Sequence, residues 1–340
     1  MLDALSRFIW SESFWLPNNV TWEQLKGNAA VRYPQVYELK YTLYFGVIML
    51  FVRLLCECFV FLPIGHFWGW SDRSQSLPLK IFQHANFGFA GKAKFKRVAE
   101  TAWRFVFYLF AWLGGIYVMY DQPQVHDVNE CWRNYPNHPL PEKVWWYYMI
   151  ETGFYWALLF SSVVFDIRRA DFYQLTLHHI VTISLLFISW STNMVRVGTL
   201  VLFSHDVADI LIELGKLLRY ARWQNTLNVL FVIFMCVWCG TRLFYYPYYV
   251  IHSVVFNAPK LIQDNYRWQD LLQRPIVPRV LMTMLCCLLV LHIFWTIVLV
   301  KVAVHTVRHG EMDDIREDAS DADEPSADEP AARKMAKKKD

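Results

Sequence analysis

Residues 280–300 read VLMTMLCCLLVLHIFWTIVLV, a stretch with no charged residue and a single histidine, His292. About 20 predominantly apolar residues are enough for a helix to cross the roughly 30 Å hydrocarbon core of a bilayer. The apolar character extends over 279–303. This segment therefore predicts a transmembrane helix and makes the chain a membrane protein.

Further stretches of the same kind lie upstream, at 41–62, 101–120, 145–165, 172–190, 195–216 and 226–250. The 340-residue chain is 55% hydrophobic and 17% aromatic, which exceeds ordinary globular usage. Together these features predict an all-α polytopic membrane protein with about seven transmembrane helices. The stretches 172–190 and 195–216 hold ionisable residues and are joined by a very short linker, so a half-inserted hairpin is an alternative there.

Orientation follows from the basic residues, because Lys and Arg are enriched in cytoplasmic loops. The basic loops are therefore expected on the cytosolic side. Their basic residues are Arg73, Lys80, Lys92, Lys94, Lys96, Arg97, Arg168, Arg169, Lys216, Arg219 and Arg222. The sequence Asn19-Val20-Thr21 is a glycosylation sequon, which is useful only in the lumen. The sequon thus places the N-terminus in the lumen. An odd number of spans then places the C-terminus in the cytosol.

The chain divides into a lumenal segment 1–40, a first transmembrane helix 41–62, a basic cytosolic loop 63–97, a membrane domain 98–306 and a tail 307–340. The tail is acidic and polar, a composition that predicts disorder. It ends in Lys337-Lys338-Lys339-Asp340, which is similar to the dilysine retrieval signal of the endoplasmic reticulum.

Two serines of the tail, Ser320 and Ser326, precede acidic residues and are therefore candidate sites for an acidophilic kinase. A merely solvated acidic tail is the alternative. The formal net charge of the whole chain is only +3, which gives no indication of a nucleic-acid partner.

Two neighbouring spans concentrate ionisable side chains, which are costly inside a bilayer and usually mark a site. The fourth span carries His178 and His179, and the fifth carries His205, Asp206, Asp209 and Glu213. At 1.5 Å per residue, His178 and Asp209 lie at matching depths, each roughly 10 Å from the cytosolic end of its helix. The spacing of Asp206, Asp209 and Glu213 places them on one face of the helix, and this face can be directed toward the histidines.

Two other interpretations of these residues are a set of hydrogen bonds between helices and a metal centre. The His-x-x-x-His boxes of membrane di-iron enzymes are absent, and adjacent histidines diverge by about 100° on a helix. Cys236-x-x-Cys239 has no second ligand pair. A metal is therefore not expected, and a catalytic site is favoured over purely structural hydrogen bonds.

Residues 166–220 resemble the Lag motif of ceramide synthases, within their TLC domain, which here would span 98–306. The residues that carry the resemblance are Arg169, Asp171, His178, His179, Thr182, Ser189, Asn193, Arg196, Gly198, Thr199, Leu200, His205, Asp206, Asp209, Glu213 and Lys216. Ala170, Ala208 and Gly215 depart from the usual residues of the motif. The loop 63–100 is too short for the homeobox-like insert of many animal members.

The resemblance implies a TLC-domain bundle or barrel of helices around an intramembrane cavity, in the endoplasmic reticulum. It implies N-acylation of a sphingoid base by a fatty acyl-CoA, without a cofactor. The expected partners are these two substrates, membrane lipid and a second chain in a homo- or heterodimer. A TLC-type protein that binds, senses or moves lipid without catalysis is the alternative.

For the chemistry, His178 is the expected nucleophile and His179 assists proton transfer, while Asp206 and Asp209 orient a histidine or the amine. Direct attack by the amine with histidine as base remains open. The remaining candidates for substrate contact are His205, Glu213, Asn193, Arg196, Arg168 and Arg169.

The sequon and the basic loops generate a testable prediction about topology. Glycosidase treatment is expected to shift the gel mobility of the wild-type protein but not of Asn19→Gln, because only a lumenal Asn19 is glycosylated. A C-terminal tag in intact microsomes should be digested by added protease. A protected tag would contradict the odd number of spans.

Overall fold

The computed structural model describes residues 11–18, 20–28, 31–69, 75–86, 94–166 and 170–309, and contains no strand among them. The long helices are α3 (Lys40–Cys56), α6 (Lys94–Met119), α7 (Glu142–Val164), α8 (Phe172–Ser191), α9 (Val195–Tyr220), α10 (Gln224–Trp238) and α12 (Val277–His309). Helix α3 continues into the π-helix η2 (Glu57–Phe61) and then into α4 (Leu62–Phe67). Helix α10 continues into the π-helices η6 (Cys239–Ile251) and η7 (Ser253–Asn257) and then into α11 (Ala258–Ile262). Short helices are α2 (Glu12–Trp15) and α5 (Leu77–Ala85), and single 3₁₀ turns are η1 (Val36–Leu39), η4 (Pro123–Val125) and η5 (Val128–Cys131).

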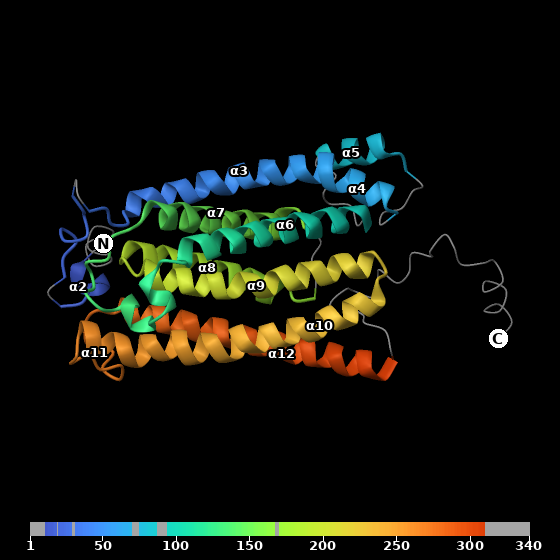
Figure 1. The fold of residues 1–340 in the computed structure, drawn as a ribbon. Helices are drawn as coiled ribbons and strands as arrows, with labels where there is room; N and C mark the ends of the chain where they lie inside the picture. The colour runs from blue at the N-terminus through green and yellow to red at the C-terminus, as the bar shows by residue number, and fades with distance from the viewer. Residues whose placement is uncertain are drawn as a thin grey trace.

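Five helical segments among the described residues are long and apolar enough to cross a membrane. They are Val36–Phe67, Lys96–Met119, Phe172–Ser191, Gln224–Ile262 and Val277–Arg308. Helices α7 and α9 are less apolar but run beside the others along the bundle (Figure 1). The predicted all-α polytopic membrane protein is thus confirmed, while the count of seven spans stays a prediction.

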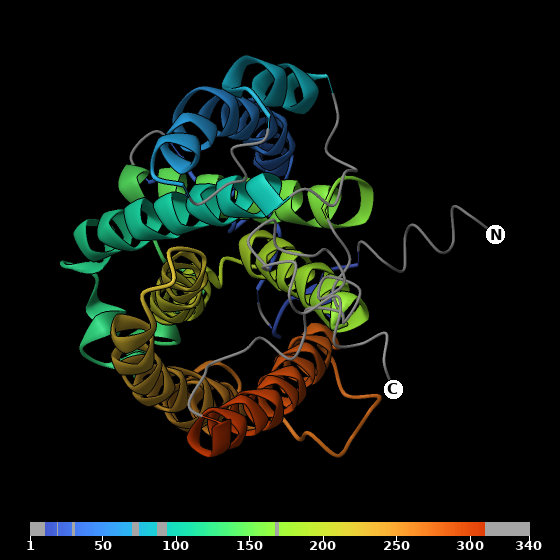
Figure 2. The same cartoon turned by 90° about the vertical axis from the view of Figure 1, so that its right-hand side faces the viewer.

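Helices α8, α9 and α12 form a ring with η6. In this ring α8 contacts α9 and α12, α12 contacts η6, and η6 contacts α9. Outside it, α6 packs along α9 and α7 along α8, and α3 lies on the far side of α7, as the end-on view shows (Figure 2). The inner helices can therefore carry polar residues, because their faces meet protein rather than lipid.

Two glycines allow α3 to pack closely against α7. A Cβ atom added to Gly153 would lie 2.6 Å from the Cβ of Phe45, and one added to Gly46 would lie 3.1 Å from the carbonyl oxygen of Gly153. Small residues at such crossings let helix backbones approach, which is how helices commonly associate in membranes. The outermost helix is therefore held in part by direct backbone proximity.

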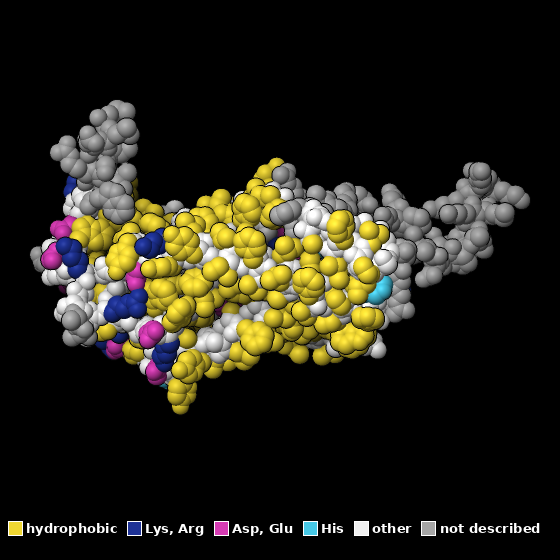
Figure 3. Space-filling model, turned by 90° about the horizontal axis from the view of Figure 1, so that it is seen from above, with side chains coloured by type: hydrophobic (Ala, Val, Ile, Leu, Met, Phe, Trp, Pro, Cys, Tyr) yellow, Lys and Arg dark blue, Asp and Glu magenta, His cyan; other side chains and the backbone are white. Residues whose placement is uncertain are grey.

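The molecular surface fits a bilayer environment. On the face seen in Figure 3, hydrophobic side chains cover most of the length, and charged side chains gather at the end that carries α2. Exposed apolar residues such as Phe51, Phe59 and Val290 point outward from the long helices. Cys131 in the loop at the charged end is 1% exposed, and burial raises the pKa of its thiol, so it is packed as an inert side chain.

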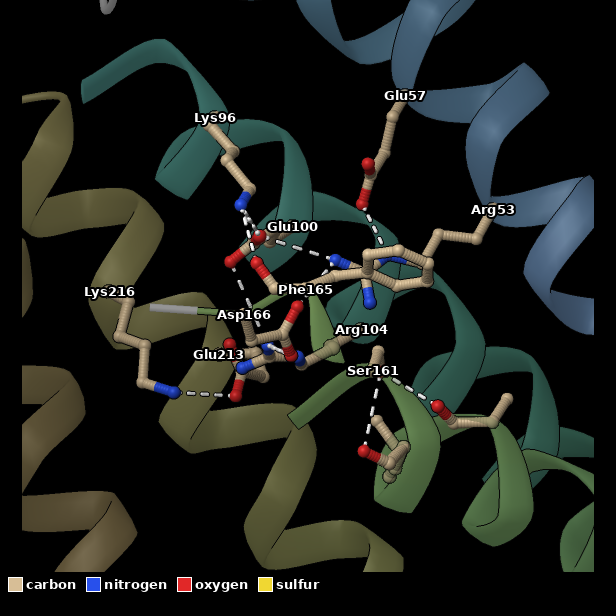
Figure 4. A network of polar contacts seen from close by, with 12 residues as sticks. Arg53, Glu57, Lys96, Glu100, Arg104, Ser161, Phe165, Asp166, Glu213 and Lys216 are labelled. Carbon is tan, nitrogen blue, oxygen red and sulfur yellow. Dashed lines mark hydrogen bonds and ion pairs between the residues drawn. The ribbon is translucent and has the colours of Figure 1, made fainter. Parts of the chain in front are cut away.

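A buried network of charges joins α3, α6 and the end of α7 (Figure 4). The guanidinium of Arg53 lies 2.7 Å from Glu57, 3.3 Å from Glu100 and 3.0 Å from Asp166. Arg104 lies 2.9 Å from Asp166, and the Nζ of Lys96 donates to the carbonyl oxygen of Phe165 at 2.8 Å. Three helices that are far apart in the sequence are thereby connected at one end of the bundle.

The segment 63–97, expected as a basic loop, is largely structured where the structure describes it. It contains α5 and the start of α6, and Lys80 and Lys96 are each only 1% exposed. The Nζ of Lys80 lies 3.3 Å from Nδ1 of His66, and His84 of α5 lies 2.6 Å from Glu57. These two lysines are buried because they have polar partners in the protein, so they are not simply solvated topological signals.

Removing the central arginine of the network should destabilise the protein strongly. Arg53→Ala leaves Glu57 and Asp166 buried without their main counter-charge, which typically costs about 3–5 kcal/mol. The expected result is a clearly lower thermal midpoint of the detergent-purified protein, followed by fluorescence-detected size exclusion. Lys26→Ala is the control, because the Lys26–Glu23 pair is exposed. Equal midpoints for the two variants would contradict the stabilising role of the network.

Candidate functional site

The adjacent histidines lie on α8, one third of the way along the helix. His179 is 5% exposed and His178 is partly buried, and their ring centroids are 5.5 Å apart. Tyr155 of α7 packs over both, with its ring centroid 6.4 Å from His178 and 6.1 Å from His179. Trp295 of α12 stands edge-on to His178 at 5.5 Å. The rings are thus positioned by aromatic side chains from two other helices.

The three acids of α9 have different partners. Asp209 accepts a hydrogen bond from Arg242 at 3.1 Å, and Glu213 pairs with Lys216 at 2.6 Å (Figure 4). Asp206 is fully buried and accepts a hydrogen bond from the hydroxyl of Tyr147 at 3.4 Å. Asp209 and Glu213 line the same pocket as both histidines, whereas Asp206 is directed toward α7.

His205 belongs to a second imidazole pair. Its ring centroid lies 5.1 Å from that of His292 on α12 and 5.2 Å from that of Tyr246 on η6. Its Nδ1 is 3.2 Å from the hydroxyl of Ser204. His292 is fully buried and 3.3 Å from Arg242 through Nε2. His205 also lines the apolar pocket described next.

Two pockets meet at His178. One is almost entirely apolar and is lined by residues that include Thr182, Ser189, Met194, Leu281 and Leu288, up to Pro17 at the end that carries α2. The other runs the opposite way and is called the polar pocket here, because charged side chains form part of its lining. That lining includes Arg104, Asp166, Asp171, His179, Asp209, Glu213, Lys216, Arg242 and Trp295. His178 and Tyr155 line both pockets. An imidazole at such a junction is open to a polar group on one side and to an apolar chain on the other.

The remaining candidates lie elsewhere. Asn193 adopts a left-handed conformation, with φ of 55°, in the turn between α8 and α9, and its amide donates to the carbonyl oxygens of Pro136 and His138. Arg196 donates to the carbonyl oxygen of Glu130 at 2.6 Å. Both residues therefore tie a loop to the helices at the end remote from the acids. Asn19, Arg168, Arg169, Ser320 and Ser326 fall outside the described residues.

Three residues of the site were not expected from the sequence: Tyr155, Arg242 and Trp295. Arg242 could have been found, because an arginine inside the span 226–250 is as costly as the histidines that were noticed. His292 stands alone in its apolar stretch, and a lone histidine in a membrane helix is more often a hydrogen-bonding residue between helices than part of a site. The aromatic residues carry no signal of their own in a chain that is 17% aromatic.

The site has no arrangement of side chains that suits a metal ion. Within the described residues, no group of three or more His, Cys, Asp or Glu side chains could hold one. The imidazoles, carboxylates and guanidinium of the site can themselves act as nucleophile, base and fixed charge.

Comparison with known proteins gives the family. Residues 97–301 match the TLC domain family. The chain is 40% identical over 313 residues to Ceramide synthase hyl-2 of Caenorhabditis elegans, with 91% of this chain and 93% of the relative covered. It is 42% identical over 317 residues to Ceramide synthase hyl-1 of the same organism (92% and 84% covered), and 32% identical over 361 residues to human Ceramide synthase 5 (96% and 89% covered). The chain therefore belongs to the ceramide synthase family of TLC-domain membrane proteins.

Proposed function

We propose that this protein is a sphingoid base N-acyltransferase that makes ceramide or dihydroceramide from a fatty acyl-CoA. The observation that carries the proposal is the position of His178 at the junction of an apolar and a polar pocket. An acyl thioester has the same division, an apolar chain on one side of its carbonyl and a polar carrier on the other. The names of the relatives support the same reaction.

The apolar pocket accepts the acyl chain. Along α8 it is lined from His178 to Ser189, and along α12 from Leu288 to Pro278, about 15 Å or more of helix in each case. The polar pocket at the other end accepts the amine of the sphingoid base and the thioester end of CoA. Its lining of both charge signs suits a cationic amine and an anionic carrier.

The proposed reaction has two steps. First, an imidazole nitrogen of His178 attacks the thioester carbonyl, a C–N bond forms, the C–S bond breaks, and CoA leaves as a thiol with the imidazole proton, transferred through His179. The sphingoid ammonium then gives a proton to His179, which releases it to the polar pocket. The neutral amine attacks the acyl-imidazole, an amide C–N bond forms, the C–N bond between the acyl group and the imidazole breaks, and the His178 imidazole takes up the amine proton.

The carboxylates support these steps from their observed positions. Asp209 lines the polar pocket and attracts the ammonium group before it is deprotonated. Asp206, hydrogen-bonded to Tyr147, fixes the contact between α9 and α7. We further propose the endoplasmic reticulum as the location, with the polar pocket toward the cytosol, which supplies acyl-CoA.

Replacing the proposed catalytic residues should abolish acyl transfer without unfolding the protein. His178→Ala, His179→Ala and Asp209→Asn are each expected to reduce ceramide formation at least about 100-fold, since each loses a nucleophile, a proton carrier or a cation partner. The assay is amide formation from acyl-CoA and sphingoid base by purified protein. His252→Ala is the matched control, because this histidine is exposed between η6 and η7. A wild-type protein that binds both lipids without forming amide would instead indicate a binding or transport protein.

The order of steps can be tested without the amine. Incubation with acyl-CoA alone is expected to release a stoichiometric burst of CoA and to leave an acyl group on His178, detectable by peptide mass spectrometry. His178→Ala should give neither. If CoA is released only after the amine is added, the amine attacks the thioester directly and the histidines act as bases.

A further inference from the structure

Arg242 is a buried cation that the proposed reaction steps leave without a role. Its side chain is 4% exposed, and the residue lies on the π-helix η6, where it lines the polar pocket together with the two histidines of α8. Such π-helical segments often occur at functional sites. A guanidinium remains charged in proteins, so its burial requires compensating partners.

Those partners hold the guanidinium in one place. One terminal nitrogen donates to the side chain of Asp209 at 3.1 Å and to the carbonyl oxygen of His205 at 3.0 Å. The other lies 3.3 Å from Nε2 of His292, and the guanidinium carbon is 5.3 Å from the ring centroid of Trp238. Arg242 thus joins η6 to α9 and α12 across the ring of helices.

The two bonds to α9 act on the same turn. In an α-helix the carbonyl of residue i faces the amide of residue i+4, so the carbonyl of His205 lies directly below Asp209. One nitrogen of Arg242 therefore fixes both the backbone of this turn and the carboxylate that projects from it. The Asp209 side chain keeps a quarter of its surface exposed and lines the polar pocket.

We propose that Arg242 is a positioning residue that holds the carboxylate of Asp209 toward the polar pocket, where that carboxylate binds the ammonium group of the sphingoid base. This assignment rests on the proposed acyltransferase function. In this assignment Arg242 contributes to binding of the amine substrate through Asp209, and other residues bind the acyl-CoA. Losing Arg242 should therefore affect the two substrates unequally.

The test compares the KM values for the two substrates in the full-length protein. Arg242→Ala is expected to raise the KM for the sphingoid base at least tenfold and to leave the KM for acyl-CoA within about threefold. Arg242→Lys should lie between Arg242→Ala and wild type, because lysine keeps the charge but has one nitrogen for the partners that the guanidinium reaches with two. Arg133→Ala, an exposed arginine in a loop at the charged end, is the control and should match wild type.

A second comparison separates action through Asp209 from general damage. In an Asp209→Glu background, which retains a carboxylate of altered reach, the further change Arg242→Ala should raise the amine KM by much less than in wild type. A variant that is folded but shows unchanged KM values, or KM values raised equally for both substrates, overturns the assignment. If wild type forms no amide at all, the proposed function itself fails and this role with it.

Discussion

Ionisable side chains in spanning helices must find their partners within the protein, because hydrocarbon offers no hydrogen bonds. Two groups of such side chains organise this molecule. Around Arg53, carboxylates and lysines connect α3, α6 and the end of α7. Around Arg242, a carboxylate and a histidine connect α9, η6 and α12. Each group ties helices that the apolar surface alone would leave free to slide against one another in lipid.

Both groups contribute side chains to the proposed site. Asp166 and Arg104 of the first group line the polar pocket, as do Asp209 and Arg242 of the second. Part of the wall of this pocket therefore consists of paired charges, which hold each other in position before any substrate arrives. Fixed charges of this kind can stabilise a charged substrate with little reorganisation, which is the usual source of electrostatic catalysis.

Much of the fold could be predicted from the sequence because lipid imposes a simple rule on outward-facing helices. The apolar run 280–300 and the pair His178–His179 stand out by composition alone. The rule weakens for inner helices: α7 is rich in aromatic residues and α9 in ionisable ones, and neither meets the criteria for a span by apolarity. Periodicity placed Asp206 with Asp209, but the contact of Asp206 with Tyr147 depends on how α7 packs. Likewise, the burial of Lys80 and Lys96 follows from partners that lie 14 and 69 residues away in the chain.

The division of the cavity at His178 also affects how water reaches the imidazole. An acyl-imidazole is reactive toward water as well as toward an amine, so an acyltransferase must admit one nucleophile and restrict the other. Here Tyr155 and Trp295 pack against the imidazole, and the pocket on the acyl side is lined almost wholly by apolar groups. Charged side chains attract water to the polar pocket, where the proposed ammonium site at Asp209 lies. In the proposed mechanism, an amine bound there would occupy the side from which water approaches, so binding of the second substrate would itself favour amide formation over hydrolysis.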